Sequence, residues 1–152
     1  MFDLQWVRDG VREKQRSAKA IEATVGFAAD DFGSGVAYVE LRTSRAQRVA
    51  RVDFSVRRIP SLVGREIGYA AITAVAERLA DAGFQKASFK VSDSQLVDDL
   101  GANSDVAPEL SLPYVNLRCQ LNRFRVATVI VDDAADDLEA RARAEVTLHV
   151  AA

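Results

Sequence analysis

The chain has 152 residues, 49% of them hydrophobic and 28% charged, a size and composition typical of one soluble globular domain. Its net charge of −2 argues against a surface that attracts nucleic acid everywhere. There is one cysteine, Cys119, and one histidine, His149, which argues against a disulfide framework, a Cys/His metal site and His-dependent catalysis. Any chemistry would therefore rest mainly on carboxylates.

The sequence contains no apolar run near the ~20 residues that a membrane span needs. Its first ten residues, MFDLQWVRDG, carry acids where a signal peptide has its basic and apolar regions. We therefore expect a cytoplasmic protein with no membrane partner. Leu4, Val7 and Val11 recur at helical spacing, so residues 1–20 are predicted to form an N-terminal helical arm and residues 21–150 the main domain.

The main domain begins with three predicted strands. EATVGFAA (22–29) is rich in small and β-branched residues and ends at the turn DDFGSG. VAYVELR (36–42) and the alternating VARVDFSVRR (49–58) follow after short connections, which predicts an antiparallel meander. A long helix is then expected from about residue 62 to 81, closed by Gly83.

Strands and helices alternate in the second half. KASFKV (86–91) reads as a strand, and SDSQLVDDL (92–100) opens a short helix. A helix over 112–123 leads into RVATVIV (125–131), which we expect to be the most buried strand, and DDAADDLEARARAEV reads as a terminal helix. The pattern predicts an α/β fold with a mixed five-stranded sheet, three antiparallel strands followed by parallel ones, and helices on both faces.

Three acids stand where a strand end meets a helix start: Glu66, Asp93 and Asp136. Carboxylates are favoured at helix N-termini by capping and by the helix dipole, so each one alone has a sufficient structural explanation. Neighbouring strand ends in a mixed sheet also bring distant residues together, which allows a common metal site. The residues by themselves leave both interpretations open.

The order of these segments and their residue patterns resemble those of ribonuclease H of type 1 and its reverse-transcriptase-like relatives. REIGYAAITAVAERLADAG is similar to the helix that carries that family's glutamate, and FKVSDSQLVDDL is similar to its Asp-Ser motif. DDAADDLEARA resembles its closing segment, with Asp132 where an Asn would stand and Leu138 in the core. The resemblance runs from about residue 23 to 144 and implies a ribonuclease H-like fold with Glu66, Asp93 and Asp136 as site residues.

One departure concerns the family's first carboxylate, which belongs within the first strand. Ala28 stands at that point, and Asp30 lies two residues further along the same side of a strand. A different register, a relocated ligand and a lost ligand all remain possible. The usual histidine before the last strand is also absent from GANSDVAPELSLPY.

The resemblance implies a function as well as a fold. Ribonuclease H activity is hydrolysis of the RNA strand of an RNA/DNA hybrid by two Mg²⁺ or Mn²⁺ ions held by carboxylates. Asp93 would bridge the ions, Glu66 and Asp136 would each hold one, and Asp30 would be the fourth ligand. Nucleic-acid contacts are expected from Arg42, Arg45 and Ser94.

The resemblance favours an endoribonuclease, and two other interpretations stay open. With Ala28 in place of the first aspartate, activity is expected to be weak, and a catalytically inactive ribonuclease H-like domain that binds nucleic acid or a protein is the alternative. A third is an unrelated α/β domain in which the acids only cap helices.

Overall fold

A computed structural model describes residues 20–101 and 105–151 of the chain. Five strands form a single sheet in the order β3-β2-β1-β4-β5. The strands are β1 (Ala20–Ala29), β2 (Ser34–Arg42), β3 (Gln47–Ser55), β4 (Lys86–Val91) and β5 (Val126–Val131). The predicted arm over residues 1–20 lies, except for Ala20, outside the described residues.

The sheet is mixed in the way that the sequence predicts. β1 pairs antiparallel with β2, and β2 pairs antiparallel with β3. β4 joins the other side of β1 in a parallel pairing, and β5 is parallel to β4. The carboxyl ends of β1, β4 and β5 therefore lie at one edge of the sheet, where a site built from their following residues is expected.

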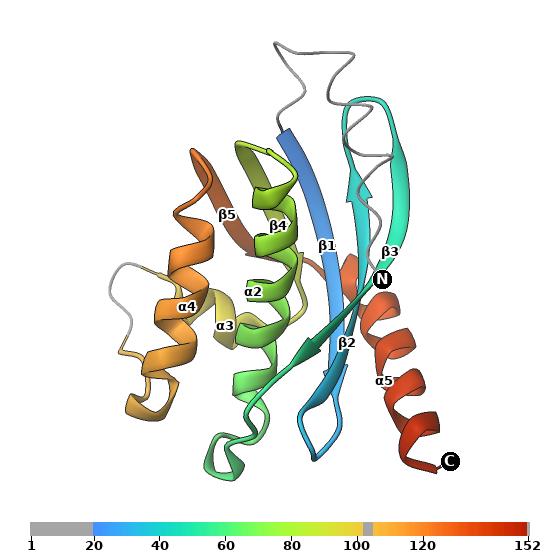
Figure 1. The fold of residues 1–152 in the computed structure, drawn as a ribbon, viewed down its shortest axis with the longest axis vertical. Coiled ribbons are helices and arrows are strands. Elements are labelled where there is room, and N and C mark those ends of the chain that lie inside the picture. Colours follow the sequence, from blue (N-terminus) through green and yellow to red (C-terminus); the bar gives the residue numbers. More distant parts are fainter. Residues whose placement is uncertain (1–19, 102–104, 152) are drawn as a thin grey trace.

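Helices lie on both faces of the sheet (Figure 1). α2 (Arg65–Asp81), α3 (Ser94–Asp99) and α4 (Ser111–Leu121) share the main hydrophobic core with one face, and α5 (Asp136–Ala151) packs on β1 and β2 from the other. Short 3-10 turns precede α2, α4 and α5. The main core includes Val25, Ile72, Leu79 and Phe89, all fully buried.

α5 approaches β1 closely at Gly26. A Cβ added to Gly26 would lie 2.0 Å from the backbone nitrogen of Glu139 and 2.3 Å from the carbonyl carbon of Leu138. Only a residue without a side chain allows this contact. The position of α5, and with it that of Asp136 at its first turn, depends on this glycine.

The expectation that residues 125–131 form the most buried strand is wrong. β5 is an edge strand, and Val126, Ile130 and Val131 are 49%, 44% and 50% exposed. The physical reason is that α5 covers β1 and β2, so one face of β5 has no helix over it in the described part of the chain. An apolar run alone does not distinguish this arrangement from a strand covered on both faces.

Candidate functional site

Asp93 lies between the end of β4 and the start of α3. Its Oδ1 accepts a hydrogen bond from the backbone N–H of Leu96 at 3.1 Å, so it is the N-cap of α3. Its Oδ2 faces α2 at Gly68, where an added Cβ would lie 3.2 Å away. The same Cβ would lie 3.1 Å from Cζ of Phe27. One carboxylate oxygen is therefore used for capping, and the other faces a glycine in a closely packed region.

Asp93 and Asp136 line the same cavity, about 630 Å³ in volume, at the carboxyl edge of the sheet. Glu139 and Arg143 from α5 also line it, and these two side chains form an ion pair of 3.8 Å. Ala28 of β1 and Ile67 of α2 contribute apolar side chains to the same wall. This cavity, which we call the Asp93 cavity, thus brings together two of the four predicted carboxylates.

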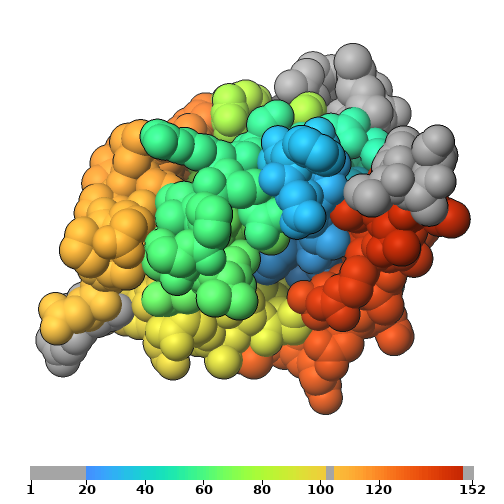
Figure 2. Space-filling view, turned by 90° about the horizontal axis from the view of Figure 1, so that it is seen from below, coloured from blue at the N-terminus to red at the C-terminus, as the bar shows by residue number. Residues whose placement is uncertain are grey.

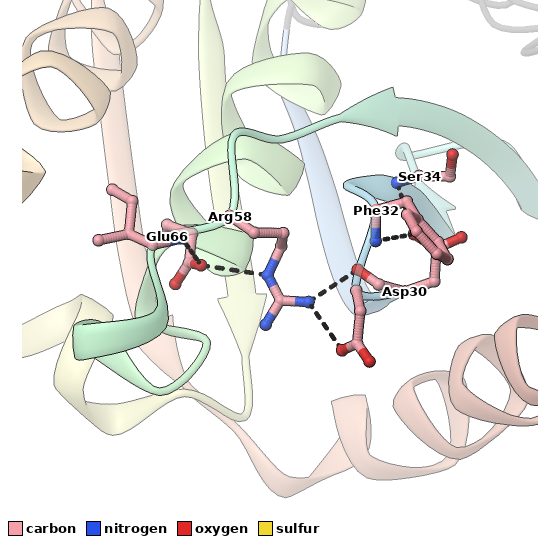
Figure 3. A network of polar contacts seen from close by, with 7 residues as sticks. Asp30, Phe32, Ser34, Arg58 and Glu66 are labelled. Atoms are coloured by element: carbon pink, nitrogen blue, oxygen red, sulfur yellow. Dashed lines mark hydrogen bonds and ion pairs between the residues drawn. The ribbon is translucent and has the colours of Figure 1, made fainter.

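Glu66 does not line the Asp93 cavity; it lines a different cavity, between the end of β3, α2 and α4. It is 1% exposed, and its Oε2 accepts hydrogen bonds from Nε of Arg58 at 3.1 Å and from the backbone N–H of Ile59 at 2.6 Å (Figure 3). Burial alone would raise the pKa of Glu66, but the backbone N–H groups of Ile59 and of Glu66 itself, together with Arg58, hold it below its usual value. Glu66 is therefore a buried carboxylate that ties α2 to the segment after β3.

Asp30 lies in the tight turn between β1 and β2. Its Oδ1 accepts hydrogen bonds from the backbone N–H groups of Phe32 and Ser34, and its carbonyl oxygen accepts one from Nη1 of Arg58 at 2.7 Å (Figure 3). Figure 2 shows this turn, in blue, between the segment that follows β3 and α5. The carboxylate of Asp30 is thus engaged in forming the turn and does not line the Asp93 cavity.

The residues expected to contact nucleic acid are divided between the two ends of the sheet. Ser94 follows Asp93 and is exposed at the carboxyl edge. Arg42 lies opposite Glu22 in the register of β1 and β2, near the start of β1, and Arg45 lies in the adjoining β2–β3 turn. Ala29 lies seven positions after Glu22 along β1, which is roughly 23 Å at the usual rise per residue. The two arginines therefore do not flank the Asp93 cavity.

A buried polar network that no sequence motif predicts lies beside the site. Asp99 at the end of α3 is 2% exposed and accepts hydrogen bonds from Tyr69, Arg65 and Gln95. Burial would raise the pKa of Asp99, but these donors hold it below its usual value. The network fixes α3 against α2, and so fixes the position of Asp93.

The donor set at the carboxyl edge does not fit a site for two divalent cations. Within residues 20–101 and 105–151, no group of three or more His, Cys, Asp or Glu side chains is arranged to hold a metal ion. Two hard cations need several carboxylates directed at one point. Here Glu66 is paired with Arg58, and Asp30 is part of a turn.

The element order and pairing define a ribonuclease H-like fold, as the sequence resemblance implies. RNase H1 from the halophilic archaeon Halobacterium salinarum NRC-1 superposes with a TM-score of 0.62 at 23% identity, over 81% of this chain and 93% of that one. The N-terminal RNase H domain of rv2228c from Mycobacterium tuberculosis superposes with a TM-score of 0.64 at 15% identity, over 81% of this chain and 95% of that one. LC11-RNase H1, in complex with an RNA/DNA hybrid, superposes with a TM-score of 0.51 at 12% identity, over 80% of this chain and 95% of that one.

At these identities the likeness concerns the fold. No protein-family model matches the sequence, and no curated protein matches it. None of the helices in the described ranges is long and apolar enough to cross a membrane. The activity must therefore be argued from the site itself.

Proposed function

We propose that this chain is a ribonuclease H-fold domain that binds nucleic acid and does not hydrolyse it by the two-metal mechanism. The observation that carries the absence of two-metal hydrolysis is the pair formed by Gly68 and Asp93. The α2 residue that faces Asp93 is a glycine, and the nearest acid on that helix, Glu66, is buried in an ion pair elsewhere.

The loss of one facing carboxylate has a direct electrostatic cost for metal binding. Divalent cations are held at such sites by the summed negative charge and oxygen ligands of several acids. In the Asp93 cavity, Arg143 adds a positive charge next to Glu139 and opposes cation binding further. Mg²⁺ or Mn²⁺ would therefore bind weakly, and the pair of ions that the hydrolysis requires would not be held together.

The proposed partner is nucleic acid of the RNA/DNA-hybrid class, bound at the basic end of the sheet. Arg42, Arg45 and Arg48 cluster at the β2–β3 turn, with Lys86 at the start of β4 on the same end. The opposite end carries the acids Asp30, Asp31, Asp93 and Asp136, which repel phosphates when no metal neutralises them. The charge distribution thus favours contact at the end far from the Asp93 cavity.

Weak metal-dependent cleavage of the RNA strand is the second candidate function. The observation that favours it is that Asp93 and Asp136 line one cavity. Two carboxylates from the ends of different elements could hold a single divalent cation. This candidate differs from the first in requiring hydrolysis that depends on Asp93.

A hybrid binding and cleavage assay separates the two. The full chain is incubated with a labelled RNA/DNA hybrid in Mg²⁺ or Mn²⁺, alongside Asp93→Asn. We expect salt-dependent binding without cleavage by either protein. Cleavage by the unaltered chain that Asp93→Asn abolishes would replace the proposal with the second candidate. The absence of binding at low salt would refute the nucleic-acid partner.

A further inference from the structure

We infer that β5 is a docking edge for a second copy of this chain, which joins two five-stranded sheets into one by antiparallel pairing of the two β5 strands. β5 lies at the opposite edge of the sheet from β3 (Figure 1), and within residues 20–101 and 105–151 its only strand neighbour is β4. The edge shares no residue with the Asp93 cavity or with the arginines and lysine of the basic end. The inference therefore does not depend on the proposed function.

The outer edge of β5 offers backbone hydrogen-bonding groups at every second residue. The N–H of Val126 donates to the carbonyl oxygen of Gln85, just before β4. The N–H of Asp132, six positions later, donates to the carbonyl oxygen of Val91 at the end of β4. Because the direction of these groups alternates along a strand, the even-numbered residues face β4 and the odd-numbered ones face outward. The outward groups are those of Ala127, Val129 and Val131.

β5 lacks the features that keep edge strands apart. Its sequence, VATVIV, contains no charged residue and no proline, and its pairing with β4 runs without a bulge from Val126 to Val131. The other edge strand, β3, carries Arg48, Arg51 and Asp53. Charged side chains on an edge oppose pairing with another strand. The sequence therefore favours β5 over β3 as the edge that pairs.

The side chains on the face of β5 that α5 leaves open set the register. Val126 and Ile130 are 49% and 44% exposed, and Thr128 lies between them on the same face. With Thr128 on the twofold axis, Val126 of one copy lies opposite Ile130 of the other. These are the closely spaced pairs of an antiparallel ladder, where β-branched pairs and Thr–Thr pairs stabilise the contact. In the same register the outward groups of Ala127 meet those of Val129.

The charges at the two ends of β5 favour antiparallel over parallel pairing. Arg125 precedes the strand and Asp133 follows it, and both are exposed. In the antiparallel register, Arg125 of one copy is the diagonal neighbour of Asp133 of the other, a separation that a long side chain spans. Parallel pairing would instead bring the two arginines together. Charge complementarity thus selects a second, antiparallel copy as the occupant of this edge.

The paired surface is small because only one six-residue strand of each copy takes part. Interfaces of this size form weak complexes, so we expect a dissociation constant of roughly 10 to 100 µM. Sedimentation equilibrium of the full chain, 16.6 kDa, without nucleic acid and at concentrations on both sides of that range tests the inference. The mean mass should rise from that of one chain toward that of two. A mass that stays at one chain, or rises past two, would overturn the inference.

A charge exchange at Thr128 tests the register, because this residue would lie opposite its own copy. Thr128→Lys and Thr128→Glu each place like charges opposite each other and should weaken association about fivefold or more. An equimolar mixture of the two variants places a lysine opposite a glutamate and should restore association, which also shows that both variants are folded. Variants that associate like the unaltered chain, or a mixture as weak as its components, would refute the pairing.

A matched control on β4 separates edge pairing from packing of the open faces. Ser88 is the register neighbour of Thr128, and the two hydroxyl oxygens lie 3.3 Å apart. Ser88→Lys adds the same charge one strand further from the edge, where screening weakens its effect on the other copy, and should leave association unchanged. An equal loss in Ser88→Lys and Thr128→Lys would mean that the open faces pack together, and would overturn the inference. Since no nucleic acid is present, a failure here leaves the proposed function untouched.

Discussion

Gly68 and Asp93 face each other where α2 crosses the end of β4, with only 3.2 Å between Oδ2 of Asp93 and the position that a Cβ on residue 68 would occupy. Phe27 and Leu96 close the remaining space at 3.1 Å and 3.4 Å from the same point. The position from which a helix residue could share a cation with Asp93 is therefore filled by apolar packing. A carboxylate on residue 68 would not fit there without displacing these two side chains.

The docking of α5 should be highly sensitive at Gly26. Gly26→Ala places a methyl group within 2.3 Å of two backbone atoms of α5, which cannot move without shifting the helix. We expect a loss of about 3 kcal/mol in the free energy of unfolding, the upper part of the range for overpacked cores. Urea denaturation measures it, with exposed Ala140→Gly as a control that should cost about 1 kcal/mol. A loss below that of the control would contradict the close approach of α5.

The pair of adjacent acids at the end of α3 provides a matched test of the buried network. Asp99→Asn weakens the hydrogen bonds to Tyr69 and Arg65 in a buried place, and should cost about 2 to 3 kcal/mol. Asp98→Asn changes an exposed neighbour and should stay within about 0.5 kcal/mol. Thermal or urea unfolding of the two variants gives the comparison. Equal effects would mean that the network does not hold α3 in place.

Stability should fall in acid because two buried carboxylates have lowered pKa values. Glu66 and Asp99 both titrate below their usual range in the folded chain, so between their folded and ordinary pKa values the unfolded chain binds more protons. Their contribution to the free energy of unfolding is complete above the ordinary pKa range of carboxyl groups, about pH 4 to 5. It is lost as the pH falls through the lower pKa values of the folded chain. Urea unfolding from pH 7 to pH 3 should show this loss, and Asp99→Asn should reduce it. If Asp99→Asn and Asp98→Asn showed the same pH dependence of stability, the lowered pKa of Asp99 would not be its cause.

Hybrid binding at the basic end should depend on arginine charges there. Arg42→Ala combined with Arg45→Ala should weaken binding across sequences and reduce the slope of log affinity against log salt by about 2. Arg143→Ala removes the same kind of charge at the opposite end and should leave the slope unchanged. Fluorescence anisotropy at several salt concentrations measures both. A slope reduced by Arg143→Ala and unchanged in the double variant would place the nucleic acid at the Asp93 cavity instead.

The sequence was sufficient for the order of elements and the type of sheet. Strands and helices have different hydrophobic periods, so segments such as VARVDFSVRR and the long Ala-rich helix are distinguishable without a structure. The short connections of the meander and the helical crossovers then determine which pairings are antiparallel. The same periods predict that Asp93 lies at a strand-to-helix junction, and in the structure it is the N-cap of α3.

The rotation of α2 could not be predicted in the same way. Successive helix residues differ by about 100°, so the choice between Glu66, Ile67 and Gly68 as the residue facing Asp93 depends on which stripe packs on the sheet. That stripe includes buried Tyr69, Ile72 and Val75, but α2 is apolar around most of its circumference. The exposure of β5 escaped prediction for a related reason, since it depends on where α5 crosses the sheet.

The most direct test of the central claim is the rate of RNA cleavage in an RNA/DNA hybrid, measured in Mg²⁺ and in Mn²⁺ for the unaltered chain and for Asp93→Asn. The proposed function predicts that both proteins show the same background rate while the unaltered chain still binds the hybrid. A rate in the unaltered chain clearly above that of Asp93→Asn, and proportional to protein concentration, would contradict the account.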